Sequence, residues 1–190
     1  MREETRVPRE IMIEPLPPET AADAATMSML SDLINDVYAV AEKGLWQDDA
    51  ARTNPAEVSR FTGAGEMAVA RLSGRIVGCV RLQRLTDDLS EFGMLTAAPE
   101  SRGLGVGREL VRFAERRSRA EGRHVMQLEL LVPRTWAHPS KEFLAGWYGR
   151  IGYRVVGVSG IEEVHPGLAG LLATPCDFRV YHKDLRDQDG

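Results

Sequence analysis

The sequence has few cysteines and no long hydrophobic run, and these two absences exclude several classes of protein. Its two cysteines, Cys79 and Cys176, lie far apart, with no CxxC or Cys/His spacing. We therefore expect neither a disulfide framework nor a metal site. No window is long and apolar enough to span a membrane, and the amino-terminal MREETRVPRE leads into no apolar signal core. These features predict a cytoplasmic protein without a membrane partner.

A large excess of charge of either sign is also absent. The chain has 24 basic and 28 acidic residues, and its formal net charge is -4. Nucleic-acid-binding domains usually carry a basic surface, so no nucleic-acid partner is expected. With 190 residues, 43% of them hydrophobic, the chain has the size and composition of one globular domain. We expect a single domain over residues 1–190, with flexible ends at 1–9 and 186–190.

Hydrophobic periodicity predicts a mixed α/β fold of antiparallel strands followed by alternating strands and helices. The Ser73-Gly74 pair predicts a hairpin, and Asn54 followed by Pro55 predicts the start of a helix. The expected strands are Ile11–Leu16, Glu66–Leu72, Arg75–Leu82, Leu89–Ala97, His124–Val132, Tyr153–Val158 and Asp177–Leu185. The expected helices are Ser28–Lys43, Pro55–Phe61, a segment that ends near Gly122, and Ser140–Arg150.

Between a strand and a helix, the segment PESRGLGVGREL places glycines at 103, 105 and 107, with Arg102 and Arg108 beside them. A helix begins with unpaired N–H groups and a partial positive charge, which attract anions. Glycines allow a phosphate to approach that backbone closely, and each arginine would add about 1.5–3 kcal/mol. The segment therefore predicts a pyrophosphate site. In the helix that follows, Leu104, Leu110, Val111 and Ala114 are expected inward, and Arg112, Glu115 and Arg119 outward.

Other phosphate motifs fit this segment poorly. No Gly-Lys-Ser/Thr follows, as a Walker loop requires, and Arg108 stands where GxGxxG needs its third glycine. The pattern R-x-x-G-x-G, with Arg102, Gly105 and Gly107, resembles the coenzyme-A motif of the GNAT superfamily of N-acetyltransferases. A second segment, FLAGWYGRIGYRVVG, resembles the helix-four motif of the same family. An unrelated phosphate-binding or structural α/β domain is the alternative.

The resemblance implies a mostly antiparallel central sheet flanked by helices and splayed between strands four and five, where acetyl-CoA would lie. It places pantetheine against the backbone of Met94, Leu95, Thr96 and Ala97. It places the pyrophosphate against Arg102, Gly103, Leu104, Gly105, Val106, Gly107 and Arg108. The Leu95 N–H is the implied donor to the thioester carbonyl, and one such donor contributes about 10²- to 10³-fold in rate. Tyr148 is implied as coenzyme contact and as the acid that protonates the departing thiolate.

An acceptor amine with a pKa of about 10.4 is protonated at neutral pH, so a base must remove a proton before the amine can attack. Glu91 lies eleven residues before Arg102, the offset of the general base in histone-type members of the family. It is our first candidate, with Glu129 or a bound water as alternatives and a solvent-facing strand glutamate as the non-catalytic reading.

The acceptor itself is not defined by sequence. Trp46, Trp136 and His138 lie in loops that resemble the family's acceptor-site loops, although His138 also fits a structural role. The segment 160–176 is long enough either to cover the active site or to form a dimer contact, and homodimers are common in the family. His124, His165 and His182 have no recognisable partners. We expect acetyl transfer to a primary amine of a small molecule; the alternatives are acetylation of protein amino termini or lysines, and a non-catalytic acyl-CoA sensor.

Overall fold

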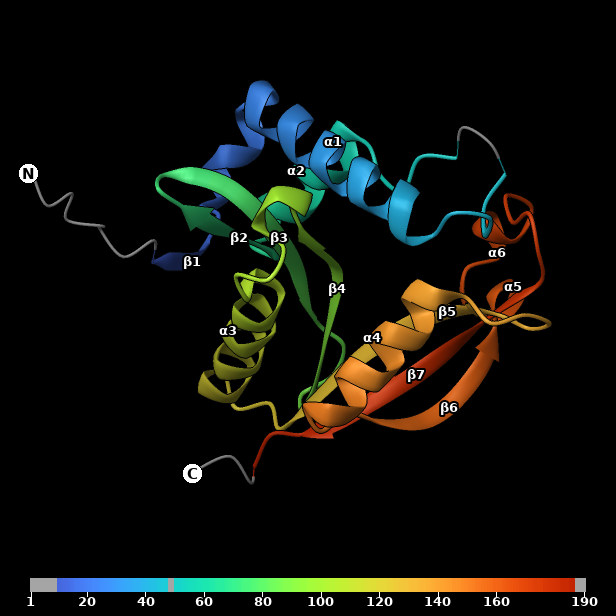
Figure 1. The fold of residues 1–190 in the computed structure, drawn as a ribbon. Helices are drawn as coiled ribbons and strands as arrows, with labels where there is room; N and C mark the ends of the chain where they lie inside the picture. The colour runs from blue at the N-terminus through green and yellow to red at the C-terminus, as the bar shows by residue number, and fades with distance from the viewer. Residues whose placement is uncertain (1–9, 48–49, 187–190) are drawn as a thin grey trace, which may run out of the picture.

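The computed structural model describes residues 10–47 and 50–186, which form one sheet with helices on both faces (Figure 1). The seven described strands follow the order β1-β2-β3-β4-β5-β7-β6. They are β1 (Ile11–Pro15), β2 (Met67–Leu72), β3 (Arg75–Arg84), β4 (Leu89–Ala97), β5 (Val125–Pro133), β6 (Arg154–Gly160) and β7 (Cys176–Asp184). Neighbouring strands are antiparallel except β4 and β5, which are parallel.

Helices α1 (Ala24–Ala41) and α2 (Pro55–Gly63) cover one face of β2, β3 and β4. Their apolar side chains form a core cluster with the strand residues that face them: Leu16, Met27, Leu30, Ile34, Val58, Phe61, Met67, Val69, Cys79 and Met94. As predicted, Asn54 begins α2 by accepting from the Glu57 N–H at 3.0 Å. Helix α1 begins before the predicted Ser28, because the Asp23 carboxylate accepts from the N–H groups of Ala25 and Thr26.

Helices α3 (Val106–Ala120) and α4 (Pro139–Arg150) contribute to the core on the opposite face. Close packing of α3 on β3 depends on Gly78. A Cβ at this position would lie 2.5 Å from the Thr96 carbonyl oxygen and 2.8 Å from Val106 Cγ1. Because such distances do not occur between packed atoms, glycine is what allows the first turn of α3 to lie against the sheet.

The structure contradicts two of the orientations expected for the third helix. Glu115 is buried, because its Oε1 accepts from the Tyr153 hydroxyl and from Lys183 Nζ, both at 2.8 Å. Leu104 is 47% exposed and precedes the helix, in the turn after the short 3-10 helix Pro99–Ser101. Buried polar groups need such partners, and periodicity along one helix cannot reveal partners that come from the residue before β6 and from β7.

Segment 160–176 contains the short helices α5 (Ile161–Val164) and α6 (Pro166–Ala169). It lies beside the loop that follows α1, at the end of the sheet nearest β6 and β7 (Figure 1). Backbone hydrogen bonds join the two segments, from Gln47 N–H to the Leu171 carbonyl at 2.8 Å and from Ala173 N–H to the Leu45 carbonyl at 2.9 Å. No helix within the two described ranges is long and apolar enough to cross a membrane.

Candidate active site

Strands β4 and β5 pair over three positions only, ending at Glu91 opposite Gln127. Beyond this point β5 continues along β7, while the β5-facing edge of β4 has no paired strand among the described residues. Met94 and Leu95 stand opposite the single β3 residue Val80, which makes a β-bulge, and Met94 has a positive φ of 50°. Such a conformation costs a non-glycine residue about 1–3 kcal/mol and is typical of functional sites. The sheet therefore opens beside strained, unpaired β4 backbone.

A cavity of about 470 Å³ lies at this opening. Its walls come from α1, the loop before α2, α2, β3, β4, β5, α4, β7 and the 160–176 segment. The polar and aromatic lining residues are Tyr38, Glu42, Trp46, Arg52, Thr53, Asn54, Glu57, Phe61, Arg81, Gln83, Glu91, Phe92, Glu129, Tyr148, His165 and Phe178, and the β4 residues Gly93, Met94 and Leu95 also line it. Both predicted base candidates, the predicted acid and the predicted oxyanion donor thus share one cavity.

Two side-chain amides hold the Glu91 carboxylate in the cavity wall. Gln83 Nε2 donates to Oε1 and Gln127 Nε2 donates to Oε2, each at 2.7 Å. The amides are themselves oriented, because Arg81 donates to Gln83 Oε1 at 2.5 Å and His182 Nε2 lies 2.8 Å from Gln127 Oε1. Since Gln127 Oε1 can only accept, His182 Nε2 carries the proton of this contact. Glu91 is therefore fixed in both position and rotation.

Glu129 lies two residues beyond Gln127 on β5, and its side chain is 18% exposed. Its Oε2 lies 3.3 Å from Nε2 of His165, which comes from the turn between α5 and α6. Burial, and then the negative charge of Glu91, raise the pKa of Glu129, whereas the hydrogen bond and charge of His165 lower it. The two carboxylates thus have different environments within one cavity.

Tyr148 reaches the cavity from α4 and is packed among aromatic rings. Its ring centroid lies 5.0 Å from Trp147, 5.9 Å from Tyr153 and 6.1 Å from Phe92. Burial raises the pKa of Tyr148 above its ordinary value of 10.0. Its hydroxyl therefore stays protonated at physiological pH, and Tyr148 is one of the residues that line the cavity.

The predicted phosphate-binding segment forms an open turn at the amino terminus of α3. Gly103 and Gly105 have φ values of 81° and 85°, and a Cβ at either position would meet nothing within 4 Å. Gly105 is the N-cap of this 15-residue helix, so the first turn presents unpaired N–H groups to the exposed surface. Arg102 and Arg108 are also exposed beside it. Bare backbone, positive helix end and two arginines suit the pyrophosphate of acetyl-CoA.

The four β4 residues predicted to bind pantetheine fall into two pairs with different surroundings. Met94 and Leu95 line the cavity, whereas Thr96 and Ala97 pair with Cys79 and Gly78 of β3. The opposite edge of this part of β4 faces the opening and is free to bond an extended ligand chain. The α3 turn follows this part of β4 closely in the chain, since Arg102 is five residues after Ala97, and the residues present fit acetyl-CoA.

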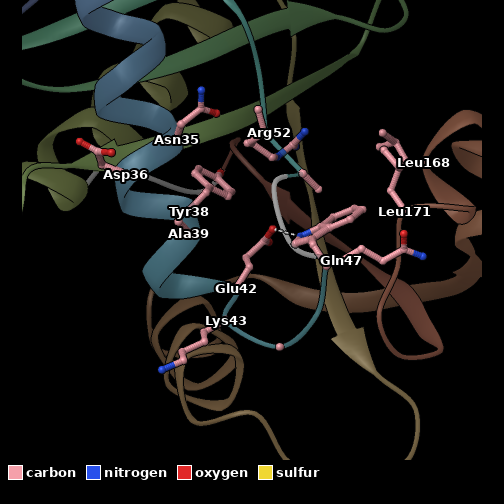
Figure 2. Close-up of a pocket in the computed structure, with 14 residues that line it drawn as sticks. Asn35, Asp36, Tyr38, Ala39, Glu42, Lys43, Gln47, Arg52, Leu168 and Leu171 are labelled. Carbon is pink, nitrogen blue, oxygen red and sulfur yellow. Dashed lines mark hydrogen bonds between the residues drawn. The ribbon is translucent and has the colours of Figure 1, made fainter.

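A second cavity of about 460 Å³ adjoins the first and shares with it Tyr38, Glu42, Trp46, Ala51, Arg52 and Leu168. Figure 2 shows α1 side chains on one side of it, with Leu168 and Leu171 opposite. Glu42 is buried here, because it accepts from Trp46 Nε1 at 2.6 Å and from Lys141 Nζ at 2.5 Å. This contact between α1 and α4 fixes Trp46 between the two cavities.

The loop tryptophans and histidines singled out in the sequence lie in different places relative to the two cavities. Trp46 lines both cavities. Trp136 and His138 line neither; Trp136 donates to Thr174 Oγ1 at 3.3 Å, and His138 Nε2 lies 3.1 Å from the Lys43 carbonyl. Segment 160–176 contributes His165 and Leu168 to the cavity wall.

Sequence reasoning missed Arg52, Gln83, Gln127 and His165. The alternation of β5 contains a signal for Gln127, which shares the face of Glu129. His165 has no such signal, because only the folding of the long segment brings it to β5.

Comparison with known proteins agrees with this geometry. The model of the acetyltransferase (GNAT) family matches residues 29–153. A blasticidin-S acetyltransferase of Streptomyces morookaense is 33% identical over 141 residues, which cover 73% of this chain and 90% of that protein. The chain belongs to the GNAT acetyltransferase family. It is an acetyl-CoA-dependent N-acetyltransferase, as the two sequence motifs predicted.

Solved structures share the fold. An aminoglycoside 6'-N-acetyltransferase complexed with coenzyme A has a TM-score of 0.65 and 15% identity, and the match covers 94% of this chain and 99% of that one. A GNAT family acetyltransferase of Elizabethkingia anophelis with acetyl-CoA bound has a TM-score of 0.56 and 13% identity, with coverage of 92% and 97%. The predicted mixed sheet, splayed between its fourth and fifth strands, is therefore confirmed.

Proposed function

We propose that this GNAT acetyltransferase transfers an acetyl group directly to a primary amine of a small molecule. The observation that carries the proposal is the lined cavity at the opening between β4 and β5, which contains Glu91, Glu129 and Tyr148 together. Two carboxylates in one partly buried cavity attract a cationic amine. The curated relative, a blasticidin-S acetyltransferase, is named for a small-molecule substrate and supports the same class.

The shape of the site favours a small acceptor over a protein segment. The loop after α1 and segment 160–176 meet beside the cavity through the Gln47–Leu171 and Ala173–Leu45 backbone bonds and the Trp46–Leu172 bridge. A lysine or an amino terminus on a protein would need an open groove for the flanking chain. Bridged loops form a pocket wall instead, which leaves space for a compact molecule.

Each group has a defined task in this proposal. Acetyl-CoA supplies the activated acetyl thioester. The α3 turn from Arg102 to Arg108 binds its pyrophosphate, the Met94–Ala97 backbone binds its pantetheine, and the Leu95 N–H stabilises negative charge on the carbonyl oxygen. The carboxylates of Glu91 and Glu129 bind the ammonium and remove its proton. Tyr148 gives a proton to the departing sulfur.

The test is calorimetric titration with acetyl-CoA, followed in the same sample by thiol release with candidate acceptors. Blasticidin S would be the first acceptor, followed by polyamines, amino acids and lysine-containing peptides. We expect acetyl-CoA binding and thiol release that depends on a small amine, with the acetylated amine identified by mass spectrometry. Release with peptides alone would instead favour a protein acetyltransferase, and binding without release from any acceptor would favour a sensor.

A further inference from the structure

The two cavity carboxylates are held in different ways. Each oxygen of Glu91 accepts an amide N–H at 2.7 Å, from Gln83 or from Gln127. In the described part of the chain, Glu129 has one side-chain partner, the ring of His165 at 3.3 Å. A carboxylate fixed by two oriented amides is suited to hold a cation in a defined place. A carboxylate with one titratable partner is suited to gain and lose a proton.

His165 connects Glu129 with the protein surface. Its ring packs edge-on against Phe178, with centroids 5.2 Å apart, while its side chain remains 44% exposed. The ring can therefore contact Glu129 through Nε2 and solvent elsewhere. An imidazole that contacts a carboxylate through one nitrogen and is otherwise exposed can pass a proton from that partly buried carboxylate to water.

We propose that Glu129, paired with His165, takes the proton from the acceptor amine, while Glu91 holds that amine in position. This inference rests on the proposed function, and it makes Glu129 rather than Glu91 the base. His165 acts through Glu129 and is a positioning and proton-relay residue.

The proton balance of the step is complete. The first ammonium proton passes to a Glu129 oxygen and then to Nε2 of the His165 tautomer that is protonated at Nδ1, and the ring releases its Nδ1 proton to solvent. The Nε2–H then donates to the ionised Glu129, and exchange with water restores the first tautomer before the next turnover. The freed nitrogen pair forms the N–C bond, and the C–S bond breaks. The second proton lost by nitrogen balances the one that Tyr148 gives to sulfur, so one proton is released in each turnover.

The other charged groups of the cavity lie on the elements packed around Glu129, and some of them affect its ionisation. Glu91 on β4 opposes its ionisation, whereas His165 and, from the loop before α2, Arg52 favour it. The remaining charged residues of the cavity have their own ion-pair partners: Glu42, the residue after α1, with Lys141, Glu57 on α2 with Arg60, and Arg81 on β3 with Glu66. Opposite Glu129 on β7 stands the uncharged Val180.

These contacts predict opposite effects of two substitutions on the pH profile. A base works when deprotonated, so the rate rises with pH through its pKa. Removing His165 removes an influence that lowers the pKa of Glu129, which moves the rising limb to higher pH. Glu91→Gln removes a charge that raises the pKa of Glu129, which moves the same limb to lower pH.

The experiment measures kcat and kcat/KM against pH with the acceptor that gives most thiol release, starting with blasticidin S. The variants are Glu129→Gln, Glu91→Gln, His165→Ala and His165→Gln. We expect Glu129→Gln to lower kcat by about 100-fold or more with acetyl-CoA affinity unchanged. Glu91→Gln should mainly raise the amine KM, and His165→Gln, which keeps a hydrogen-bond donor, should shift the limb less than His165→Ala. The exposed Glu163, on the same segment as His165, provides the matched control Glu163→Gln, which should keep the wild-type profile.

Two results would overturn the inference while the proposed function stands. One is a wild-type kcat in Glu129→Gln, and the other is a kcat loss in Glu91→Gln as large as that expected for Glu129→Gln. An unshifted limb in both His165 variants would remove His165 from the step. If the wild type binds acetyl-CoA but acetylates no small amine, the proposed function itself fails and the inference fails with it. Titration of the Glu129 carboxyl carbon by NMR checks the two pKa shifts without an acceptor.

Discussion

Gln127 donates to Glu91 across the last paired position of β4 and β5, with Gln127 Nε2 2.7 Å from Glu91 Oε2. Directly beyond this contact the two strands separate. The hydrogen bond therefore lies at the inner end of the opening and sets the direction of the Glu91 carboxylate relative to the cavity.

Replacing Gln127 with methionine tests this contact. The variant keeps the side-chain length but removes the amide that orients Glu91. A hydrogen bond to a charged group contributes about 1.5 kcal/mol, so we expect the amine KM to rise about tenfold. Steady-state kinetics with calorimetry of acetyl-CoA binding measures this, and acetyl-CoA affinity should not change. Gln83→Met, which removes the other amide, should act in the same direction; an unchanged KM in both variants would contradict the role.

Valine at Gly105 tests the phosphate-binding turn. The side chain would project from the first turn of α3 into the space proposed for the pyrophosphate, so acetyl-CoA affinity should fall at least about 100-fold. Gly74 provides the matched control, because it has a similar φ of 80°, also meets nothing within 4 Å, and lies in the β2–β3 hairpin. Gly74→Val should suffer the same backbone strain and bind acetyl-CoA normally. Equal affinity in the two variants would exclude the turn as the binding site.

Phenylalanine substitutions at Tyr148 and Tyr153 should have different effects, the first on turnover and the second on stability. Tyr148→Phe removes the proposed proton donor, so kcat should fall about 10²-fold or more while acetyl-CoA affinity is retained. Tyr153→Phe instead removes the 2.8 Å hydrogen bond to buried Glu115, and we expect a loss of about 1–3 kcal/mol in the free energy of unfolding. Kinetics and urea denaturation of both variants make the comparison. An unchanged kcat in Tyr148→Phe would remove its acid role.

The buried Glu42–Lys141 pair should stabilise the contact between α1 and α4. Lys141→Met alone leaves the Glu42 carboxylate buried with Trp46 as its one remaining side-chain donor among the described residues, which we expect to lower the free energy of unfolding by about 3–5 kcal/mol. The double variant Glu42→Gln, Lys141→Met keeps an acceptor for Trp46 and removes both charges. It should recover most of that loss in urea denaturation; a double variant as unstable as Lys141→Met would show that packing, rather than the unpaired charge, causes the effect.

Local sequence determined most of the fold. The strand Leu89–Ala97 was predicted with its observed bounds, and the Ser73-Gly74 hairpin and the Asn54 cap of α2 were also confirmed. These features depend on side-chain alternation, turn residues and caps, which act over a few neighbouring residues. The glycine segment belongs to the same class, because a helix start and bare backbone are properties of contiguous residues. For this reason the sequence identified the family.

Tertiary structure alone decided the environment of the candidate site. Glu115 was expected at the surface but is buried against Tyr153 and Lys183, and His165 had no recognisable partner although it contacts Glu129. These partners are 36 or more positions apart in the sequence, so no local pattern records them. The sequence by itself determined which elements form and where the phosphate-binding turn lies. Which carboxylate is fixed and which can exchange a proton was decided by strand order and by the folding of segment 160–176, because burial and hydrogen bonding depend on neighbours that only the folded chain brings together.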